Sequence, residues 1–304
     1  MTARNEDGVL VKSPYKKQEF TEQELQDFMK CADPDTGPEY FLRNFFFIQH
    51  PVQGKIQYNP WEFQERLIKT YHNYRFSISM MPRQTGKSTS AAGYLLWFAM
   101  FKPDSTILVA AHKYAGAQEI MQRVRYSYEA CPDHIRAGAT SYNKGSIEFD
   151  NGSRIVAQTT TENTGRGMSI TLLYCDEFAF VRPTIAKEFW TSISPTLSTG
   201  GGAIITSTPN SDEDQFAFIW KGANKTEDEY GNTKELGVNG FKAYRAYWTE
   251  HPDRDEPWAE EQRNILGIER FRREMDCEFI INDETLIAPT KLIDMEGIEP
   301  LYQT

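Results

Sequence analysis

From about residue 61 onward, short apolar runs of strand length alternate with longer stretches of helical period. The apolar runs cover residues 76–80, 106–111, 171–175 and 202–206, and the helical stretches cover 87–101, 115–130 and 184–194. A strand that is apolar throughout must be covered on both faces, and strands separated by helices pair in parallel. The alternation therefore predicts an α/β fold with a mainly parallel sheet flanked by helices.

Two local patterns add to this layout. Residues 145–149 and 154–158 flank the tight-turn signal Asn151-Gly152, which predicts an antiparallel hairpin at the edge of the sheet. Near the N-terminus, Thr21 and Glu24 have the spacing of a capping box and predict a helix over 21–30, followed by a Pro/Gly break at 33–38. The polar first forty residues resemble an arm or lid rather than a core.

Composition excludes several classes of protein. No stretch approaches the roughly twenty apolar residues of a membrane helix, and the polar N-terminus has no signal core. The four cysteines are scattered, and no histidine stands at metal-ligand spacing to them. We therefore expect a soluble, unsecreted protein with free thiols in a reducing compartment. The net charge of −10 gives no sign of a nucleic-acid partner, although a local basic groove is compatible with it.

Residues 81–89, Met-Pro-Arg-Gln-Thr-Gly-Lys-Ser-Thr, follow the apolar run 76–80 and resemble a phosphate-binding loop. Such a loop points consecutive N–H groups at phosphate oxygens, opens a helix, and supplies a lysine and a hydroxyl. Gly86, Lys87 and Ser88 provide the end of this pattern. Met81 replaces the usual first glycine, and Arg83 lies inside the loop. A Gly-Lys-Ser tripeptide also occurs in ordinary surface turns, so the rest of the chain decides between the two interpretations.

The apolar run 171–175 leads directly into two carboxylates, Asp176 and Glu177. In a parallel sheet this pair emerges at the same carboxyl edge as the phosphate-binding loop. Asp176 is predicted to hold Mg²⁺, directly or through water, and Glu177 to orient the attacking water. A solvated acidic turn is the alternative for the pair alone. Its combination with Gly86-Lys87-Ser88, about ninety residues earlier, favours hydrolysis of a nucleoside triphosphate.

Two further patterns fit a nucleotide site. The apolar run 202–206 ends in the hydroxyls of Thr206, Ser207 and Thr208, which can sense a γ-phosphate, although an ordinary Ser-Thr-Pro turn gives the same pattern. Upstream, Phe63 and Gln64 offer an aromatic face and an amide to an adenine. Aromatic residues at this spacing are more often core residues.

Taken in order, these motifs resemble the large terminase subunit of tailed bacteriophages, the ATPase motor that pumps double-stranded DNA into a preformed capsid. The resemblance spans residues 59–210 and continues weakly through 276–279. It includes the adenine motif at 63–64, the arginine-containing loop at 83–88, the stretches 107–112 and 117–120, Gly165-Arg166-Gly167-Met168-Ser169 before the carboxylate strand, and the motif at 206–210.

The resemblance implies a P-loop NTPase of the additional-strand, conserved-glutamate type with a small lid subdomain built from both chain ends. Residues 1–58 would form an N-terminal arm and part of the lid, 59–250 the ATPase core, and 251–304 the helical lid and the start of a linker. Complete members continue into a ribonuclease-H-like nuclease. We expect this chain to be a motor-domain fragment with ATPase but no nuclease activity, and the acids Asp212, Glu213 and Asp214 to lie in a solvated loop.

ATP and Mg²⁺ are the implied cofactors. Lys87 would neutralise the β- and γ-phosphates, Ser88 and Asp176 would hold Mg²⁺, and Glu177 would position water. The residues expected to bind the nucleotide are Phe63, Gln64, Gln84, Thr85, Gly86, Lys87, Ser88 and Thr89. The resemblance offers two candidates for the catalytic arginine: Arg83 in the loop and Arg166, which would reach a neighbouring subunit. The motif Thr206-Ser207-Thr208 would couple hydrolysis to DNA movement.

The implied partners are double-stranded DNA, the portal protein and the small terminase subunit, with the chain either in a ring on the capsid or monomeric in solution. The implied location is the bacterial host cytoplasm, transiently at the procapsid portal, with no membrane. One rival is a helicase-like nucleic-acid-dependent ATPase, but nothing after residue 210 resembles a second motor domain. A nucleotide-binding scaffold without hydrolysis is the other, and Glu177 argues against it.

Overall fold

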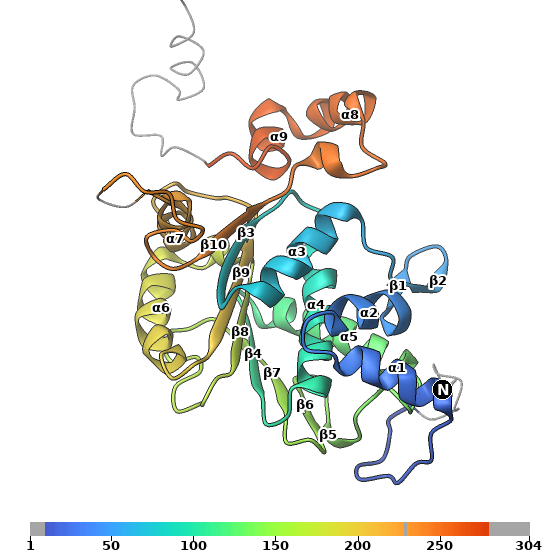
Figure 1. Ribbon diagram of the computed structural model, residues 1–304. Coiled ribbons are helices and arrows are strands. Elements are labelled where there is room, and N and C mark those ends of the chain that lie inside the picture. The colour runs from blue at the N-terminus through green and yellow to red at the C-terminus, as the bar shows by residue number, and fades with distance from the viewer. Residues whose placement is uncertain (1–9, 228–229, 280–304) are drawn as a thin grey trace, which may run out of the picture.

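The computed structural model describes residues 10–227 and 230–279, and their central feature is an eight-stranded sheet (Figure 1). Its strand order is β10-β3-β9-β8-β4-β7-β6-β5. Pairing is parallel from β10 to β7 and antiparallel for the β7–β6 and β6–β5 pairs. The strands are β3 (Phe76–Met80), β4 (Thr106–Ala111), β5 (Ala139–Tyr142), β6 (Ser146–Phe149), β7 (Arg154–Thr159), β8 (Leu172–Asp176), β9 (Gly202–Ser207) and β10 (Lys242–Arg245).

Helices cover both faces of this sheet (Figure 1). One face carries α3 (Glu62–Asn73), α4 (Lys87–Phe101) and α5 (Tyr114–Ala130), and the other carries α6 (Pro183–Leu197) and α7 (Gln215–Asn224). Alternate residues of a strand point to opposite faces. Accordingly Ile107 and Val109 belong to the core cluster under α4, whereas Leu108 and Ala110 belong to the cluster under α6. The predicted α/β fold with a mainly parallel, helix-flanked sheet is confirmed.

The expected elements agree with the structure to within three residues. The apolar runs correspond to β3, β4, β8 and β9, and the helical stretches to α4, α5 and α6. The predicted hairpin is β6–β7, although β5 lies outside it at the edge. The four-residue strands β5 and β10, and the separate pair β1 (Phe47–His50) and β2 (Gly54–Gln57), were not anticipated. They are short and partly exposed, so they carry little apolar signal.

The N-terminal segment packs against the core. Helix α1 (Glu22–Ala32) begins at the predicted capping box of Thr21 and Glu24. Helix α2 (Gly37–Phe45) lies on α4, where a Cβ on Gly93 would come within 2.4 Å of Leu42 Cδ2. Phe41 is fully buried in the same cluster as α4 and β4. The described part of residues 1–58 therefore shares a core with the region expected to be the ATPase core.

The C-terminal segment forms a small helical layer beyond the carboxyl edge of the sheet (Figure 1). It comprises a 3₁₀ turn at Trp248–Glu250, α8 (Glu256–Leu266) and α9 (Ile268–Glu274). Trp248, Ala259, Phe271 and Met275 form its own buried cluster. The segment 251–304 was expected to be helical, and α8 and α9 agree with this in its described part. Residues 280–304, where the linker was expected to begin, lie outside the described residues. Within the described part of the chain, no helix has the length and apolarity to cross a bilayer.

Candidate active site

The phosphate-binding loop joins β3 to α4. Gly86 has a φ of 76°, and a Cβ at this position would lie 2.5 Å from Gln64 Nε2, so only glycine fits. The loop is held by hydrogen bonds from Met81 N to Ser207 O (3.2 Å) and from Thr85 Oγ1 to Pro82 O (2.8 Å). Helix α4 begins at Lys87, so its positive N-terminal end faces the concave side of the loop.

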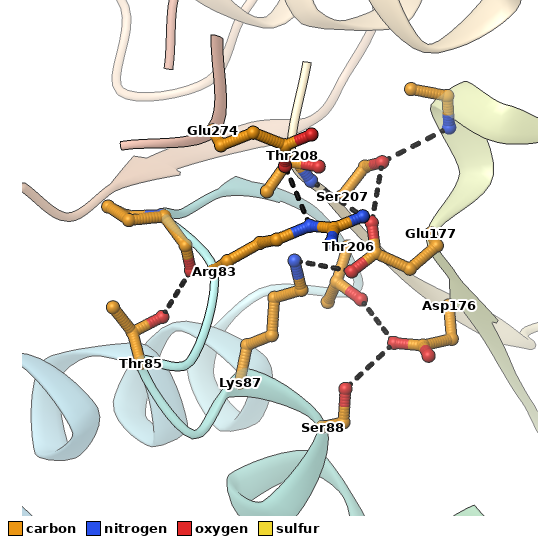
Figure 2. Close-up of polar contacts among 12 residues, drawn as sticks. Arg83, Thr85, Lys87, Ser88, Asp176, Glu177, Thr206, Ser207, Thr208 and Glu274 are labelled. Atoms are coloured by element: carbon orange, nitrogen blue, oxygen red, sulfur yellow. Dashed lines mark hydrogen bonds and ion pairs between the residues drawn. The ribbon is translucent and has the colours of Figure 1, made fainter. Parts of the chain in front are cut away.

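Lys87 and Glu177 form an ion pair over this loop (Figure 2). Lys87 Nζ lies 2.6 Å from Glu177 Oε1, and the lysine is 6% exposed. The other oxygen, Oε2, accepts hydrogen bonds from Ser207 Oγ (3.3 Å) and Thr208 N (3.2 Å). Burial acts to raise the pKa of Glu177, but the charge and hydrogen bond of Lys87, the hydrogen bond from Thr208 N and the Arg83 charge outweigh it and lower the pKa. Glu177 is therefore ionised at neutral pH.

Asp176 stands beside this pair at the end of β8. Its Oδ1 accepts hydrogen bonds from Tyr174 OH (2.8 Å), Ser88 Oγ (3.2 Å) and Thr206 Oγ1 (3.2 Å). Burial and the neighbouring Glu177 charge raise the pKa of Asp176. Three hydroxyls thus fix one carboxylate oxygen. Tyr174 was not anticipated from the sequence, although its position two residues before Asp176 puts both on the same face of the strand.

The donor set fits Mg²⁺. This ion prefers oxygen ligands and is held by one or two carboxylates together with substrate phosphates and water. The adjacent oxygens of Ser88 and Asp176 match that pattern. Among the described residues, no group of three or more His, Cys, Asp or Glu side chains could hold a metal ion, so phosphate oxygens and water would have to complete the coordination.

Arg83, inside the phosphate-binding loop, is held by a residue of α9. Its Nε lies 2.7 Å from Glu274 Oε2, and its backbone N donates to Glu274 O at 3.1 Å (Figure 2). The Arg83 side chain is 52% exposed. Arg166 is exposed between β7 and β8, and its side chain makes no hydrogen bond or ion pair to another described residue. The Arg83 charge is near enough to Glu177 to help lower the pKa of that carboxyl, and no such effect of Arg166 is seen. The choice of catalytic arginine stays a prediction.

The residues expected to bind adenine are occupied within the protein. Gln64 Nε2 donates to Thr85 O (2.9 Å), and its Oε1 accepts from Trp61 N and Tyr58 OH. Phe63 is 1% exposed and packs against Trp61, so its ring offers no free face. The amide supports the phosphate-binding loop from behind. Two predicted residues remain: Gln84 is exposed in the loop, and Thr89 lines a cavity of about 410 Å³ between β1 and α5.

The acidic segment after β9 differs in part from the expectation. Asp214 is 3% exposed, and its side chain accepts a hydrogen bond from Ala217 N at the start of α7. Burial raises the pKa of Asp214 to about 6. Asp212 is partly exposed and Glu213 is exposed. The prediction of a solvated loop was therefore wrong for Asp214, because it turns inward as a helix cap.

Comparisons with known proteins agree with this fold. Residues 78–292 match the family described as terminase large subunit, T4likevirus-type, N-terminal. The large terminase ATPase domain of Thermus phage P74-26 is 21% identical with a TM-score of 0.57, and the match covers 73% of this chain and 95% of that domain.

The large terminase of bacteriophage HK97 is 16% identical with a TM-score of 0.62, covering 79% of this chain and 54% of that one. That of the thermophilic bacteriophage D6E, in complex with ADP, is 10% identical with a TM-score of 0.55, covering 72% and 53%. This chain therefore spans about half the length of those two large terminases. At these identities the likeness shows a shared ATPase fold, whereas the family match covers more than half of the chain. The chain belongs to the T4likevirus-type terminase large subunits and contains their N-terminal ATPase domain.

Proposed function

We propose that this chain hydrolyses ATP and that hydrolysis drives double-stranded DNA into a procapsid. The observation that carries the proposal is the convergence of Lys87, Ser88, Asp176 and Glu177. The Ser88–Asp176 and Lys87–Glu177 contacts join residues 88 positions or more apart along the chain. A loop for phosphates, a hydroxyl and carboxylate for a metal ion, and a second ionised carboxylate are the parts that phosphoanhydride hydrolysis needs.

The first step is nucleotide binding. Loop amides and Lys87 would take the β- and γ-phosphates, so Lys87 would exchange the Glu177 carboxylate for phosphate oxygens. Gln84, Thr85, Gly86 and Thr89 would contribute from the loop and α4. Ser88 and Asp176 would hold Mg²⁺, which when bound neutralises phosphate charge.

Glu177 would then orient the attacking water and accept its proton. Its lowered pKa keeps it in the form that accepts a proton, and the exchange of Lys87 would free Oε1 for that task. Arg83, whose guanidinium lies over the loop (Figure 2), would stabilise the charge that develops on the phosphate. In a ring assembly, Arg166 of an adjacent copy is the alternative.

The hydroxyl motif Thr206-Ser207-Thr208 would transmit the loss of the γ-phosphate to the rest of the protein. Thr206 contacts Asp176, while Ser207 and Thr208 contact Glu177, so loss of the γ-phosphate would change the environment of the start of the β9–α7 connection. We propose this connection as the route from hydrolysis to DNA movement. The portal protein and the small terminase subunit are the proposed partners on the capsid, and the host cytoplasm is the proposed location.

A phosphate-release assay tests the enzymatic part. We expect release from ATP that requires Mg²⁺, stops on chelation, and is lost in Lys87→Ala. Release without Mg²⁺, or none from a folded protein, would contradict the proposal. A strand-unwinding assay on the same protein separates a translocase from a helicase, since only the helicase separates strands.

A further inference from the structure

Gln84 holds a strained conformation in the middle of the phosphate-binding loop. Its φ is 58°, in the left-handed region that residues with a side chain seldom adopt. Its own side chain is exposed and makes no hydrogen bond to another described residue. Strain of this kind persists only where the surroundings enforce it. Some other group must therefore stabilise the turn.

Arg254, which lies between the 3₁₀ turn at Trp248–Glu250 and α8, makes that contact. Its Nη2 donates to the carbonyl oxygens of Arg83 and Gln84, both at 3.0 Å. These oxygens belong to the two peptide groups on either side of the Gln84 Cα. The guanidinium also stacks over the Trp258 ring at 4.7 Å. One nitrogen thus fixes the orientation of both peptide planes around the strained residue.

The burial of Arg254 indicates that this contact is its main role. The residue is 9% exposed, and burial lowers its pKa. Its Nη1 is buried without a hydrogen-bond partner in the described chain. Among the described residues, its side-chain hydrogen bonds go to the two loop carbonyls alone. A buried guanidinium is costly unless its contacts compensate.

Peptide geometry connects this contact to the ligand. In a trans peptide the N–H points away from the C=O of the preceding residue. Holding the carbonyls of Arg83 and Gln84 toward Arg254 therefore turns the N–H groups of Gln84 and Thr85 the opposite way. Neither amide donates a hydrogen bond to a described residue. They are free for phosphate oxygens.

We propose that Arg254 is a positioning residue for nucleotide binding, which holds the strained Gln84 turn so that the loop amides face the phosphates. The inference rests on the proposed function. Arg254 lies 170 positions beyond Gln84 in the C-terminal helical segment. The phosphate-binding loop is therefore complete only while this segment is docked on it.

Arg254→Met tests the proposal, because methionine keeps an unbranched apolar stem beside Trp258 and removes the donors. We expect the Kd of a fluorescent ATP analogue to rise about tenfold, with kcat at saturating ATP changed less than about threefold. We also expect the Gln84 and Thr85 amides to exchange hydrogen faster in the nucleotide-free protein. Arg270→Met is the control, since Arg270 is exposed on α9 and has no side-chain hydrogen bond or ion pair to a described residue.

A suppressor separates positioning from general damage. Glycine adopts the left-handed conformation without strain. Adding Arg254→Met to Gln84→Gly should therefore raise Kd by only about twofold over Gln84→Gly alone. If Arg254→Met fails to fold, Arg254→Lys replaces it, because lysine keeps the charge but lacks the planar fork.

Wild-type affinity and amide exchange in folded Arg254→Met would overturn the inference, and so would a full tenfold loss in the Gln84→Gly background. If the wild-type protein releases no phosphate, the proposed function fails, while amide exchange in the nucleotide-free protein still decides the role of Arg254.

Discussion

Replacing Glu177 with glutamine removes a charge while keeping the shape of the side chain. In the structure, Glu177 Oε2 accepts hydrogen bonds from Ser207 Oγ and Thr208 N, which an amide oxygen can also accept. The contact that is lost is the 2.6 Å ion pair with Lys87. We therefore expect Glu177→Gln to fold, to bind ATP and to lose turnover.

Two magnitudes follow from this geometry. A general base contributes about 10²–10⁴-fold, which is about 3–5 kcal/mol of activation free energy. The second magnitude is the loss of folding stability, because the variant leaves Lys87 buried without its ionic partner. Glu177 is 26% exposed, so after screening we expect a loss of roughly 1–3 kcal/mol in the free energy of unfolding without nucleotide. ATP phosphates replace the missing partner, so ATP should raise Tm more in the variant than in the wild type.

Phosphate release under single-turnover conditions and thermal unfolding with and without ATP and Mg²⁺ measure both quantities. Glu188→Gln is the control, because Glu188 is an exposed acid on α6, and it should match the wild type in both assays. Turnover of Glu177→Gln within a factor of about three of the wild type would refute the role of general base. Loss of ATP binding would refute the idea that Lys87 exchanges one partner for another.

Further predictions concern the surrounding residues. Burial raises the pKa of Asp214 from 3.8 to about 6, so the folded state holds its proton more tightly than the unfolded state. The unfolding free energy of the wild type, relative to that of Asp214→Asn, should therefore fall by about 3 kcal/mol as the pH rises from about 3 to about 7. Urea unfolding measures this difference, and a difference that stays constant with pH would contradict the prediction. Tyr174→Phe removes a hydrogen-bond donor to Asp176 and should lower the free energy of unfolding by about 1 kcal/mol. It should also raise the Mg²⁺ concentration needed for half-maximal turnover. An unchanged Mg²⁺ requirement would contradict the idea that Tyr174 positions Asp176. Arg83→Ala should lower turnover at every protein concentration, whereas Arg166→Ala should lower turnover only at concentrations where copies of the chain assemble. ATPase rates measured over a series of protein concentrations, with light scattering to detect assembly, test this. The reverse pattern would exchange the roles of the two arginines.

Much of the fold could be predicted because its signal is local. Each long buried strand is a continuous apolar run, and each flanking helix has a helical period of its own. The short strands β5 and β10 lack this signal, because a strand of four residues at a sheet edge need not be apolar. The polar composition of the first forty residues predicts an arm or lid, but composition says nothing about which apolar side chains of this segment face the core.

Part of the candidate site could also be predicted from the sequence. The carboxyl ends of parallel strands share one edge of a sheet, so residues that directly follow β3, β8 and β9 had to meet there. The sequence alone therefore determined that Lys87, Asp176, Glu177 and the hydroxyls from Thr206 lie together. Their separations along the chain did not matter, because the strand register sets their positions in space.

Only the tertiary structure decided what surrounds that cluster. Three contacts support the phosphate-binding loop, and nothing in the local sequences of the supporting residues indicates them. Glu274 pairs with Arg83, Arg254 binds the loop carbonyls, and the Gln64 amide donates to Thr85 O. The sequence likewise predicts a surface position for Asp214, whereas in the structure its side chain is buried and caps the start of α7. A sequence pattern specifies which face of an element is apolar, whereas the pairing of two polar groups far apart in the chain depends on how the packed elements are oriented.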